Sequence, residues 1–220
     1  MSKNKKSKGM PDALRYFLFT IVVIGVVSGI GFAAFKLLDN ASSGNNKDKV
    51  KVNLNEKEIN GYGIKLDDND TTLYKTEYEA LEKNLTGDEI NYDEYAKSVA
   101  KMFIIDLYTI KNKINKYDVG GVDFVYESAK ENYTINVTDT IYKYVEDNAN
   151  GEREQQLPVV KTISVDSIEK TKFKVENAKK EYDAYSIKLT WTYSINLGYD
   201  TTGEVIVIND NNKLYVVEKN

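Results

Sequence analysis

One carboxylate stands in the apolar middle of a segment with helical periodicity. Asp106 lies between Ile105 and Leu107, and burial would raise its pKa toward the range in which a carboxylate abstracts protons at neutral pH. The alternative is a carboxylate at the helix edge, solvated or paired with Lys113 or with a lysine of the sheet. The pattern favours this alternative, because Asp106 lies off the centre of the apolar stripe. Asp106 is therefore a candidate cavity carboxylate, and no catalytic residue is assigned.

Two short acidic runs could suggest ligand-binding loops, but neither has the residues that such a loop requires. The run 67–70 (Asp-Asp-Asn-Asp) lacks the central glycine and the later glutamate of a calcium loop, so a solvated turn before a helix is expected. The run 118–123 holds a glycine pair, but no Lys-Ser or Lys-Thr follows as in a phosphate loop. We expect a tight turn there. No metal ligand and no cofactor-binding residue is assigned.

The composition excludes several classes of protein. The chain has no cysteine and no histidine, which removes disulfides, Ser-His-Asp and Cys-His nucleophilic systems and nearly all zinc hydrolases. Its 34 acidic residues outnumber its 30 basic residues, and an acidic domain is poorly suited to clamping phosphates. We expect no cofactor and no nucleic-acid partner.

The elements that would position these residues begin with three helices. Thr76 starts a capping box, and Gly87 ends the first helix, one face of which carries Tyr74, Tyr78, Leu81 and Leu85. The second helix is predicted over residues 93–113, with a cap at Asn91 and an inward stripe of Ala96, Ala100, Phe103, Leu107, Ile110 and Ile114. A third, short helix is predicted over residues 122–130. Residues 138–145 fit either a further helical turn or a first strand.

The remainder predicts an antiparallel sheet. Its expected strands are 157–165, 168–175, 185–197, 205–208 and 214–217. Apolar and polar residues alternate without a fault over 185–197, which indicates one wet face and one buried face that includes Trp191 and Tyr193. One of the last two strands is expected to be a sheet edge that another subunit could pair with.

The strongest single signal lies near the N-terminus. Residues 16–35 carry no charge and are flanked by Arg15 and Lys36. About 20 helical residues rise roughly 30 Å, the hydrocarbon thickness of a bilayer. We expect a transmembrane helix over residues 16–38. A cleaved signal peptide is the alternative, but its apolar core usually runs for about 7–15 residues.

The charge pattern orients this helix and divides the chain. Four lysines (Lys3, Lys5, Lys6 and Lys8) precede the helix, and such residues tend to stay in the cytoplasm. We therefore expect a cytoplasmic basic tail over 1–15, a linker or extended arm over 39–72, and an external α+β domain over 73–220. The predicted location is the cell membrane, with a single pass.

Three small residues share one face of the predicted membrane helix. Gly25, Gly29 and Ala33 recur at intervals of four, a spacing that lets two helix backbones approach closely in lipid. Glycine and alanine are also common in membrane helices for other reasons. Self-association through this face and a plain membrane span both stay open.

Helices followed by a meander of long strands form an α+β pattern. Over about residues 90–220, the order of elements resembles the cone-shaped, cystatin-like fold of nuclear transport factor two, ketosteroid isomerases and polyketide cyclases. The resemblance implies a long helix packed in the concavity of a curved antiparallel sheet. In isomerases of this fold a cavity aspartate acts as the base, with tyrosines as hydrogen-bond donors, and Asp106 would take that role here.

With its basic tail, single anchor and external cone domain, the whole chain resembles the bitopic scaffold subunits of type IV secretion and conjugation machines. That resemblance implies a non-catalytic protein whose partners are the lipid bilayer, other copies of itself and other envelope proteins. Two rivals stay open: a small-molecule-binding or sensory cone domain, and an isomerase-like enzyme that uses Asp106. An open apolar pocket would favour either rival.

Overall fold

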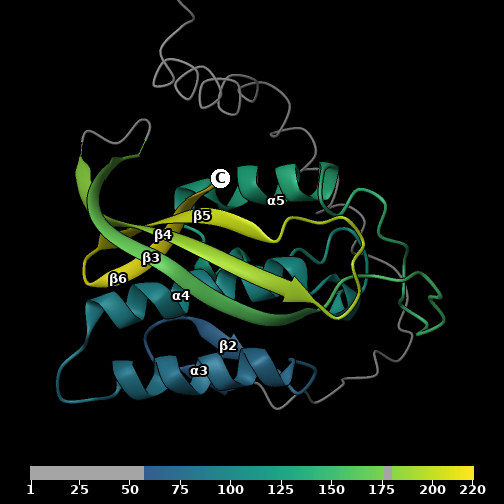
Figure 1. Ribbon diagram of the computed structural model, residues 1–220, viewed down its shortest axis with the longest axis horizontal. Coiled ribbons are helices and arrows are strands. Elements are labelled where there is room, and N and C mark those ends of the chain that lie inside the picture. The colour runs from purple at the N-terminus through teal and green to yellow at the C-terminus, as the bar shows by residue number, and fades with distance from the viewer. Residues whose placement is uncertain (1–56, 176–179) are drawn as a thin grey trace, which may run out of the picture. The chain divides into compact units, whose positions relative to one another are not determined.

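The computed structural model describes residues 57–175 and 180–220 (Figure 1). The predicted membrane helix at 16–38, with Gly25, Gly29 and Ala33, lies outside these ranges. Inside them, no helix combines the length and the apolar character needed to cross a bilayer. The described residues form an α+β arrangement of helices with a four-stranded antiparallel sheet and a separate two-stranded hairpin.

The hairpin comes first. β1 (Lys57–Ile59) pairs antiparallel with β2 (Ile64–Leu66), and the turn between them contains two glycines with positive φ, a conformation that glycine adopts without steric cost. Ile59 and Ile64 are buried in the main core. The hairpin falls within residues 39–72, the segment expected to be a linker or extended arm, and its own residues 57–66 are packed on the domain.

The first helix begins earlier than predicted. The N-cap of α3 (Thr72–Leu85) is Thr71, whose hydroxyl accepts the backbone N–H of Tyr74. The predicted capping box at Thr76 is wrong, because the Thr76 hydroxyl donates to the backbone oxygen of Thr72 inside the helix. The predicted inward face is confirmed, since its four members are buried: Tyr74, Tyr78, Leu81 and Leu85.

The second helix has the predicted start and an earlier end. Asn91 caps α4 (Tyr92–Tyr108), because its side-chain oxygen accepts the backbone N–H groups of Asp93 and Glu94. The chain leaves the helical conformation at Thr109, and a 3₁₀ turn (η1, Ile110–Asn112) follows. Because the helical period stops there, Ile114, which was expected to point inward, is 52% exposed.

The predicted helix over 122–130 is wrong. Two 3₁₀ turns, η2 (Val122–Phe124) and η3 (Glu127–Ala129), occupy that stretch, and the α-helix α5 (Lys130–Asp139) begins where the predicted helix ends. The physical reason is a tertiary contact. Val125 forms an isolated parallel bridge with Val216, and the N–H of Tyr126 donates to the backbone oxygen of Val216 at 2.9 Å. Extended backbone at this point interrupts any helix.

Four strands form the sheet, in the order in which they follow along the chain: β3 (Val160–Lys174), β4 (Glu181–Tyr193), β5 (Thr202–Asp210) and β6 (Lys213–Lys219). β3 joins the two strands predicted at 157–165 and 168–175 into one strand of 15 residues. A register shift between Val165 and Ser167 marks a bulge. After the bulge, the residues that face the core are the alternate set to those before it, so the alternation of apolar and polar residues is interrupted. This interruption is why the sequence pattern indicated two strands where the structure has one.

β4 has the predicted length but a shifted position. It spans 13 residues and ends at Tyr193, so that Ile195 and Leu197 lie in the following loop, 40% and 38% exposed. Trp191 is buried at 1% exposure and Tyr193 is half-buried against the core. β5 and β6 are joined by a tight turn in which Asn211 and Asn212 both have positive φ, as a two-residue hairpin turn requires.

The main core lies between α4 and the sheet. α4 packs against all four strands, and Figure 1 shows it between α3 and the long, curved strands β3 and β4. Its apolar residues are almost fully buried, including Val99, Met102, Phe103, Ile104 and Ile105. α4 is therefore the element around which the domain is organised, and its C-terminal end carries Asp106.

The sheet has two edges, β3 and β6. The prediction that one of the last two strands is an edge is confirmed: it is β6, which contains 214–217, whereas 205–208 lies in β5, which pairs with both β4 and β6. The outer side of β6 is partly covered by the contacts of Val125 and Tyr126 with Val216. Within the described ranges β3 pairs with β4 alone, so β3 is the more open edge.

Candidate functional site

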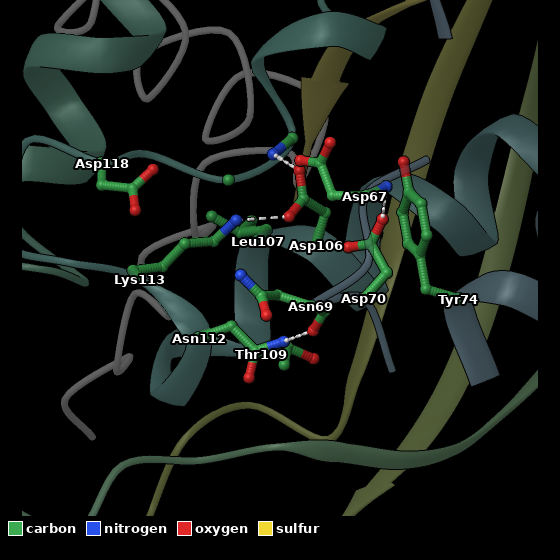
Figure 2. Close-up of polar contacts among 12 residues, drawn as sticks. Asp67, Asn69, Asp70, Tyr74, Asp106, Leu107, Thr109, Asn112, Lys113 and Asp118 are labelled. Atoms are coloured by element: carbon green, nitrogen blue, oxygen red, sulfur yellow. Dashed lines mark hydrogen bonds and ion pairs between the residues drawn. The ribbon is translucent and has the colours of Figure 1, made fainter. Parts of the chain in front are cut away.

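The predicted cavity carboxylate is held on both of its oxygens. Asp106 projects from the C-terminal part of α4, where its Oδ1 accepts the Lys113 ammonium at 2.5 Å and its Oδ2 accepts the backbone N–H of Gly121 at 2.6 Å. Figure 2 shows the two dashed contacts converging on this carboxylate. The pairing with Lys113 is the arrangement offered as the alternative to a free base. Asp106 thereby ties two segments that follow α4 back to the helix.

The glycine pair that Asp106 holds is packed too closely for any side chain. A Cβ at Gly120 would lie 2.1 Å from the backbone oxygen of Asp106, and a Cβ at Gly121 would lie 2.7 Å from the hydroxyl of Tyr133. Gly121 also has a φ of +81°, where other residues are strained. The hydroxyl of Tyr133 donates to the backbone oxygen of Gly120 at 2.6 Å. The expected tight turn is present, and it is fastened to α4.

A second tyrosine fastens the same turn to the end of α4. The hydroxyl of Tyr142 donates to the backbone oxygen of Leu107 at 2.7 Å and accepts the N–H of Gly120 at 3.3 Å. Burial, followed by the negative charge of Asp106, raises the pKa of Tyr142 well above its usual value. The hydroxyl therefore stays neutral and keeps its donor role at any physiological pH.

The ion pair is shielded from solvent. The side chains of Lys113 and Asp106 are 14% and 25% exposed. Burial lowers the pKa of Lys113, but the opposing charge and hydrogen bond of Asp106 outweigh it, and the net pKa is raised. Lys113 therefore stays charged and is a fixed cation beside Asp106.

Further carboxylates lie near this ion pair: Asp70 and Asp118 act on Lys113, Asp67 acts on Asp70, and Asp123 lies near Asp106. Asp70 accepts the N–H of Asp67 at 2.7 Å; burial raises its pKa, with that N–H opposing. Burial likewise raises the pKa of Asp123, and the charge of Asp106 adds to the effect. One oxygen of Asp67 is buried without a hydrogen-bond partner among the described atoms. Several carboxylates therefore lie near the Lys113 ammonium, and Lys65 and Lys130 add positive charge near Asp123.

The cavity at this cluster is the size of one water molecule. Its volume is about 20 Å³, close to what one water needs, and Figure 2 shows several of its lining residues: Asp70, Tyr74, Asp106, Thr109, Asn112 and Lys113. The Tyr74 hydroxyl donates to the backbone oxygen of Lys65 at 3.2 Å. In the described part of the chain, no three acidic side chains are placed to hold a metal ion.

This geometry suits a structural role for Asp106. A general base needs an oxygen within hydrogen-bond reach of a substrate, and both oxygens of Asp106 already accept short hydrogen bonds. Pockets for organic ligands usually have volumes of about 300 Å³ or more, far above the cavity here. What the arrangement does is hold the Gly120–Gly121 turn and the segment after α4 in one place.

An arginine that the sequence analysis did not single out holds the next segment. Arg153 donates to the backbone oxygens of Lys111 at 2.8 Å and of Lys113 and Glu146 at 3.0 Å each. Its own N–H donates to the side chain of Asn148 at 2.9 Å. Arg153 and Arg15 are the only arginines of the chain, and this rarity was a signal that could have drawn attention to it. A guanidinium can satisfy three carbonyl groups at once, which an ammonium on a flexible stem does less well.

The loop held by Arg153 borders an open, polar hollow of about 400 Å³. Its lining residues are all polar or charged: Glu146, Asp147, Asn148, Asn150, Glu152, Arg153 and Glu154. Small-molecule sites are instead lined mostly by apolar and aromatic side chains. The hollow therefore does not fit the apolar pocket of a sensory domain.

Three large, exposed side chains come from segments that hydrogen bonds join to one another, and we refer to them together as the end patch: Ile114, Tyr117 and Tyr144. They are 52%, 70% and 77% exposed. The segments that carry them are fastened together, since the N–H of Asn148 donates to the backbone oxygen of Ile114 at 2.7 Å and Arg153 bridges Lys113 and Glu146. Sequence reasoning missed this patch, because Ile114 was expected inside.

Comparisons of the chain with protein-family models, with curated proteins and with solved structures find no match. The function of the protein must therefore be inferred from its own residues.

Proposed function

We propose that this protein is a non-catalytic, single-pass cell-envelope protein that acts through protein–protein contacts, as an assembly or scaffold subunit of a secretion or conjugation machine. The apolar run at 16–35 supports the membrane anchor. The order of helices and strands supports a cone-like external domain. The observation that carries the functional part of the proposal is the end patch.

The end patch has the character of a contact surface. Tyrosine is enriched at the energetic centres of protein interfaces, because it offers a large apolar area and a hydroxyl at low entropic cost. Tyr117 and Tyr144 are the most exposed of the large apolar side chains in the described ranges. A lysine lies near each ring: Lys116 at 4.9 Å from Tyr117 and Lys143 at 5.3 Å from Tyr144. Charged groups at the margin of an apolar patch favour a specific, reversible contact.

The interior of the domain supports assembly over the two rival functions. An isomerase-like enzyme needs Asp106 free and facing a substrate cavity, whereas Asp106 is paired with Lys113 beside a cavity of about 20 Å³. A sensory cone needs an apolar pocket, whereas the larger hollow is polar and open.

The test is the mass of the full-length protein in detergent, measured by light scattering at roughly 20 µM, where a weak specific interface is populated. We expect an oligomer. Replacing both Tyr117 and Tyr144 by serine should lower the mass, whereas the matched control Ile195→Ser, which changes an exposed residue of the loop after β4, should not. Gly29→Ile tests the separate contribution of the membrane helix.

A monomeric wild-type protein would overturn self-assembly. An oligomer that the tyrosine substitutions leave intact but Gly29→Ile dissociates would place assembly in the anchor and remove the end patch from the proposal. Binding of a small apolar molecule by the full-length protein would turn the proposal toward the sensory alternative.

A further inference from the structure

A lysine of β6, Lys219, lies in a setting of one carboxylate and one aromatic ring. The ammonium of Lys219 donates to Oδ2 of Asp200 at 2.8 Å and lies 5.4 Å from the centre of the Tyr108 ring. The side chain of Lys219 is 20% exposed, and that of Asp200 is 62% exposed. Neither the end patch nor the Asp106 cluster includes any of these residues, so a role for this setting does not depend on the proposed function.

The carboxylate of Asp200 is the anionic part of this setting. Its Oδ2 also accepts the hydroxyl of Tyr108 at 3.0 Å. The hydrogen bond of Lys219 lowers the pKa of Asp200, burial opposes it, and the charge of Lys219 and the bond from Tyr108 lower it further, so the net pKa is below its usual range. The carboxylate is therefore charged at neutral pH, and the hydrogen bond from Tyr108 orients it.

Three more aromatic rings pack around the ring of Tyr108. The Tyr108 ring is 5.3 Å from Trp191, 6.3 Å from Tyr193 and 6.5 Å from Tyr199, measured between ring centres. These rings are fixed by hydrogen bonds, because Nε1 of Trp191 donates to the Tyr193 hydroxyl at 2.7 Å and that hydroxyl donates to the backbone oxygen of Asp200 at 2.6 Å. A carboxylate beside the face of a buried tyrosine ring can recognise an alkylammonium group.

We propose that Tyr108 and Asp200 form a binding site for an alkylammonium group, which the chain's own Lys219 occupies in this structure. We call it the ammonium site; the rings of Trp191, Tyr193 and Tyr199 pack against its Tyr108 ring. Lys219 reaches it from the last strand, whose end is fixed by a pair of backbone hydrogen bonds between Glu204 and Asn220. An incoming ammonium, from a lysine of another protein or from a small amine, would take the place of Lys219. Lys219 thus fills the site until another ammonium group displaces it.

The experiment uses the full-length protein in detergent and the emission of Trp191, the only tryptophan of the chain. Lys219→Ala removes three methylene groups and the ammonium group from the site. Propylammonium chloride is therefore the probe that matches the removed group in size and charge. We expect a saturable change in emission in this variant that sodium chloride at equal ionic strength and neutral 1-propanol do not produce. In the wild-type protein the same change should need about tenfold more propylammonium, because the tethered Lys219 competes.

Two controls make the assignment specific. Asp200→Asn in the Lys219→Ala background removes the charge but keeps the shape, and should weaken binding by about tenfold or more. Lys219→Met fills the site with a neutral chain and should bind no amine. Nα-acetyl-lysine methylamide, compared with propylammonium, separates the two sources: binding of both indicates a partner's lysine, and binding of propylammonium alone indicates a small amine.

Absence of a saturable change in Lys219→Ala, or binding that Asp200→Asn leaves unaltered, overturns the proposal. Thermal melting establishes whether Lys219→Ala is folded. If it is not folded, the wild-type titration decides, and a wild-type protein whose Trp191 emission responds equally to propylammonium and to sodium overturns the proposal as well.

Discussion

The ammonium of Lys113 and the carboxylate of Asp106 meet at 2.5 Å across the end of α4. The same carboxylate accepts the N–H of Gly121 through its other oxygen. One side chain thus fixes both the segment that leaves α4 and the turn that comes after it. An acid can occupy this position of the apolar helix because Lys113, just beyond the end of the helix, neutralises its charge.

Removing the charge of Asp106 should destabilise the fold. Asp106→Asn leaves Lys113 shielded from solvent without its counter-ion, at a cost of roughly 2–4 kcal/mol in the free energy of unfolding. Urea denaturation followed by Trp191 emission measures the change. The matched control is Asp183→Asn, which removes the acid of an exposed pair with Lys172 and should leave the unfolding midpoint where it is. Equal effects of the two substitutions would contradict the structural role of Asp106.

A methyl group at Gly121 should be costly for two separate reasons. Gly121→Ala places a Cβ 2.7 Å from the Tyr133 hydroxyl and 2.9 Å from the Phe103 ring, at a φ of +81°. Strain at such a φ costs about 1 kcal/mol, and the collision should raise the total to roughly 3 kcal/mol or more.

Gly151 provides the matched control for this substitution. Its φ is +74°, yet a Cβ there would have nothing within 4 Å. Gly151→Ala should therefore lose only the strain, about 1 kcal/mol. Thermal melting of both variants separates the effect of backbone strain from that of the steric collision. A larger loss of stability in Gly151→Ala than in Gly121→Ala would contradict the prediction.

The stability of the domain should fall between mildly acidic and neutral pH through Asp123. Burial and the charge of Asp106 raise the pKa of Asp123 above its usual 3.8. As pH rises past 3.8, the unfolded chain releases this proton before the folded protein does, so the free energy of unfolding decreases until pH passes the raised value. Asp123→Asn cannot titrate.

The difference between the urea midpoint of Asp123→Asn and that of the wild-type protein should therefore increase in favour of the variant as pH rises from about 3.5 to about 7. Most of this increase should occur just above about pH 4. Asp70, whose pKa is raised in the same direction, still titrates in this variant, so part of the pH dependence should remain. A difference between variant and wild type that does not grow with pH would show that Asp123 is not the group responsible.

Replacing Arg153 should release the loop it holds. Arg153→Lys keeps the charge but cannot satisfy the backbone oxygens of Lys111, Lys113 and Glu146 together. We expect a loss of about 1–2 kcal/mol in stability. Limited proteolysis should show faster cleavage within residues 146–156. Glu152→Gln, an exposed neighbour, is the control and should leave the cleavage rate unchanged.

Local chemistry explains which parts of the fold the sequence could predict. Asn91 caps α4 as expected, because a cap depends on residues within one turn. The long β4 strand follows from its strict alternation, and the turn at Asn211 and Asn212 from residues that tolerate positive φ. The bulge at 165–167 was not predictable in this way, since it breaks the alternation on which the prediction depends.

Contacts between distant residues explain the rest. The helix predicted at 122–130 gives way because Val125 pairs with Val216, and no pattern within that stretch announces this pairing. Lys113 was foreseen as one partner of Asp106, because the two are close in sequence. The partnership of Tyr108 with Asp200 joins residues 92 positions apart, and periodicity carries no information about it. The candidate sites were therefore less predictable than the elements that carry them.

The open side of β3 has a consequence for how the protein behaves in concentrated solution. An unpaired strand of this length would ordinarily recruit a second copy and grow into insoluble fibres. Four exposed lysines recur along it (Lys161, Lys170, Lys172 and Lys174) against two acids, Asp166 and Glu169, which leaves β3 net positive although Lys170 and Lys172 are paired with Asp93 and Asp183. The bulge also bends the strand, so charge and shape both oppose the pairing of two such strands. Precipitation should therefore begin where that repulsion is weakened, in high salt or after acetylation of the lysines.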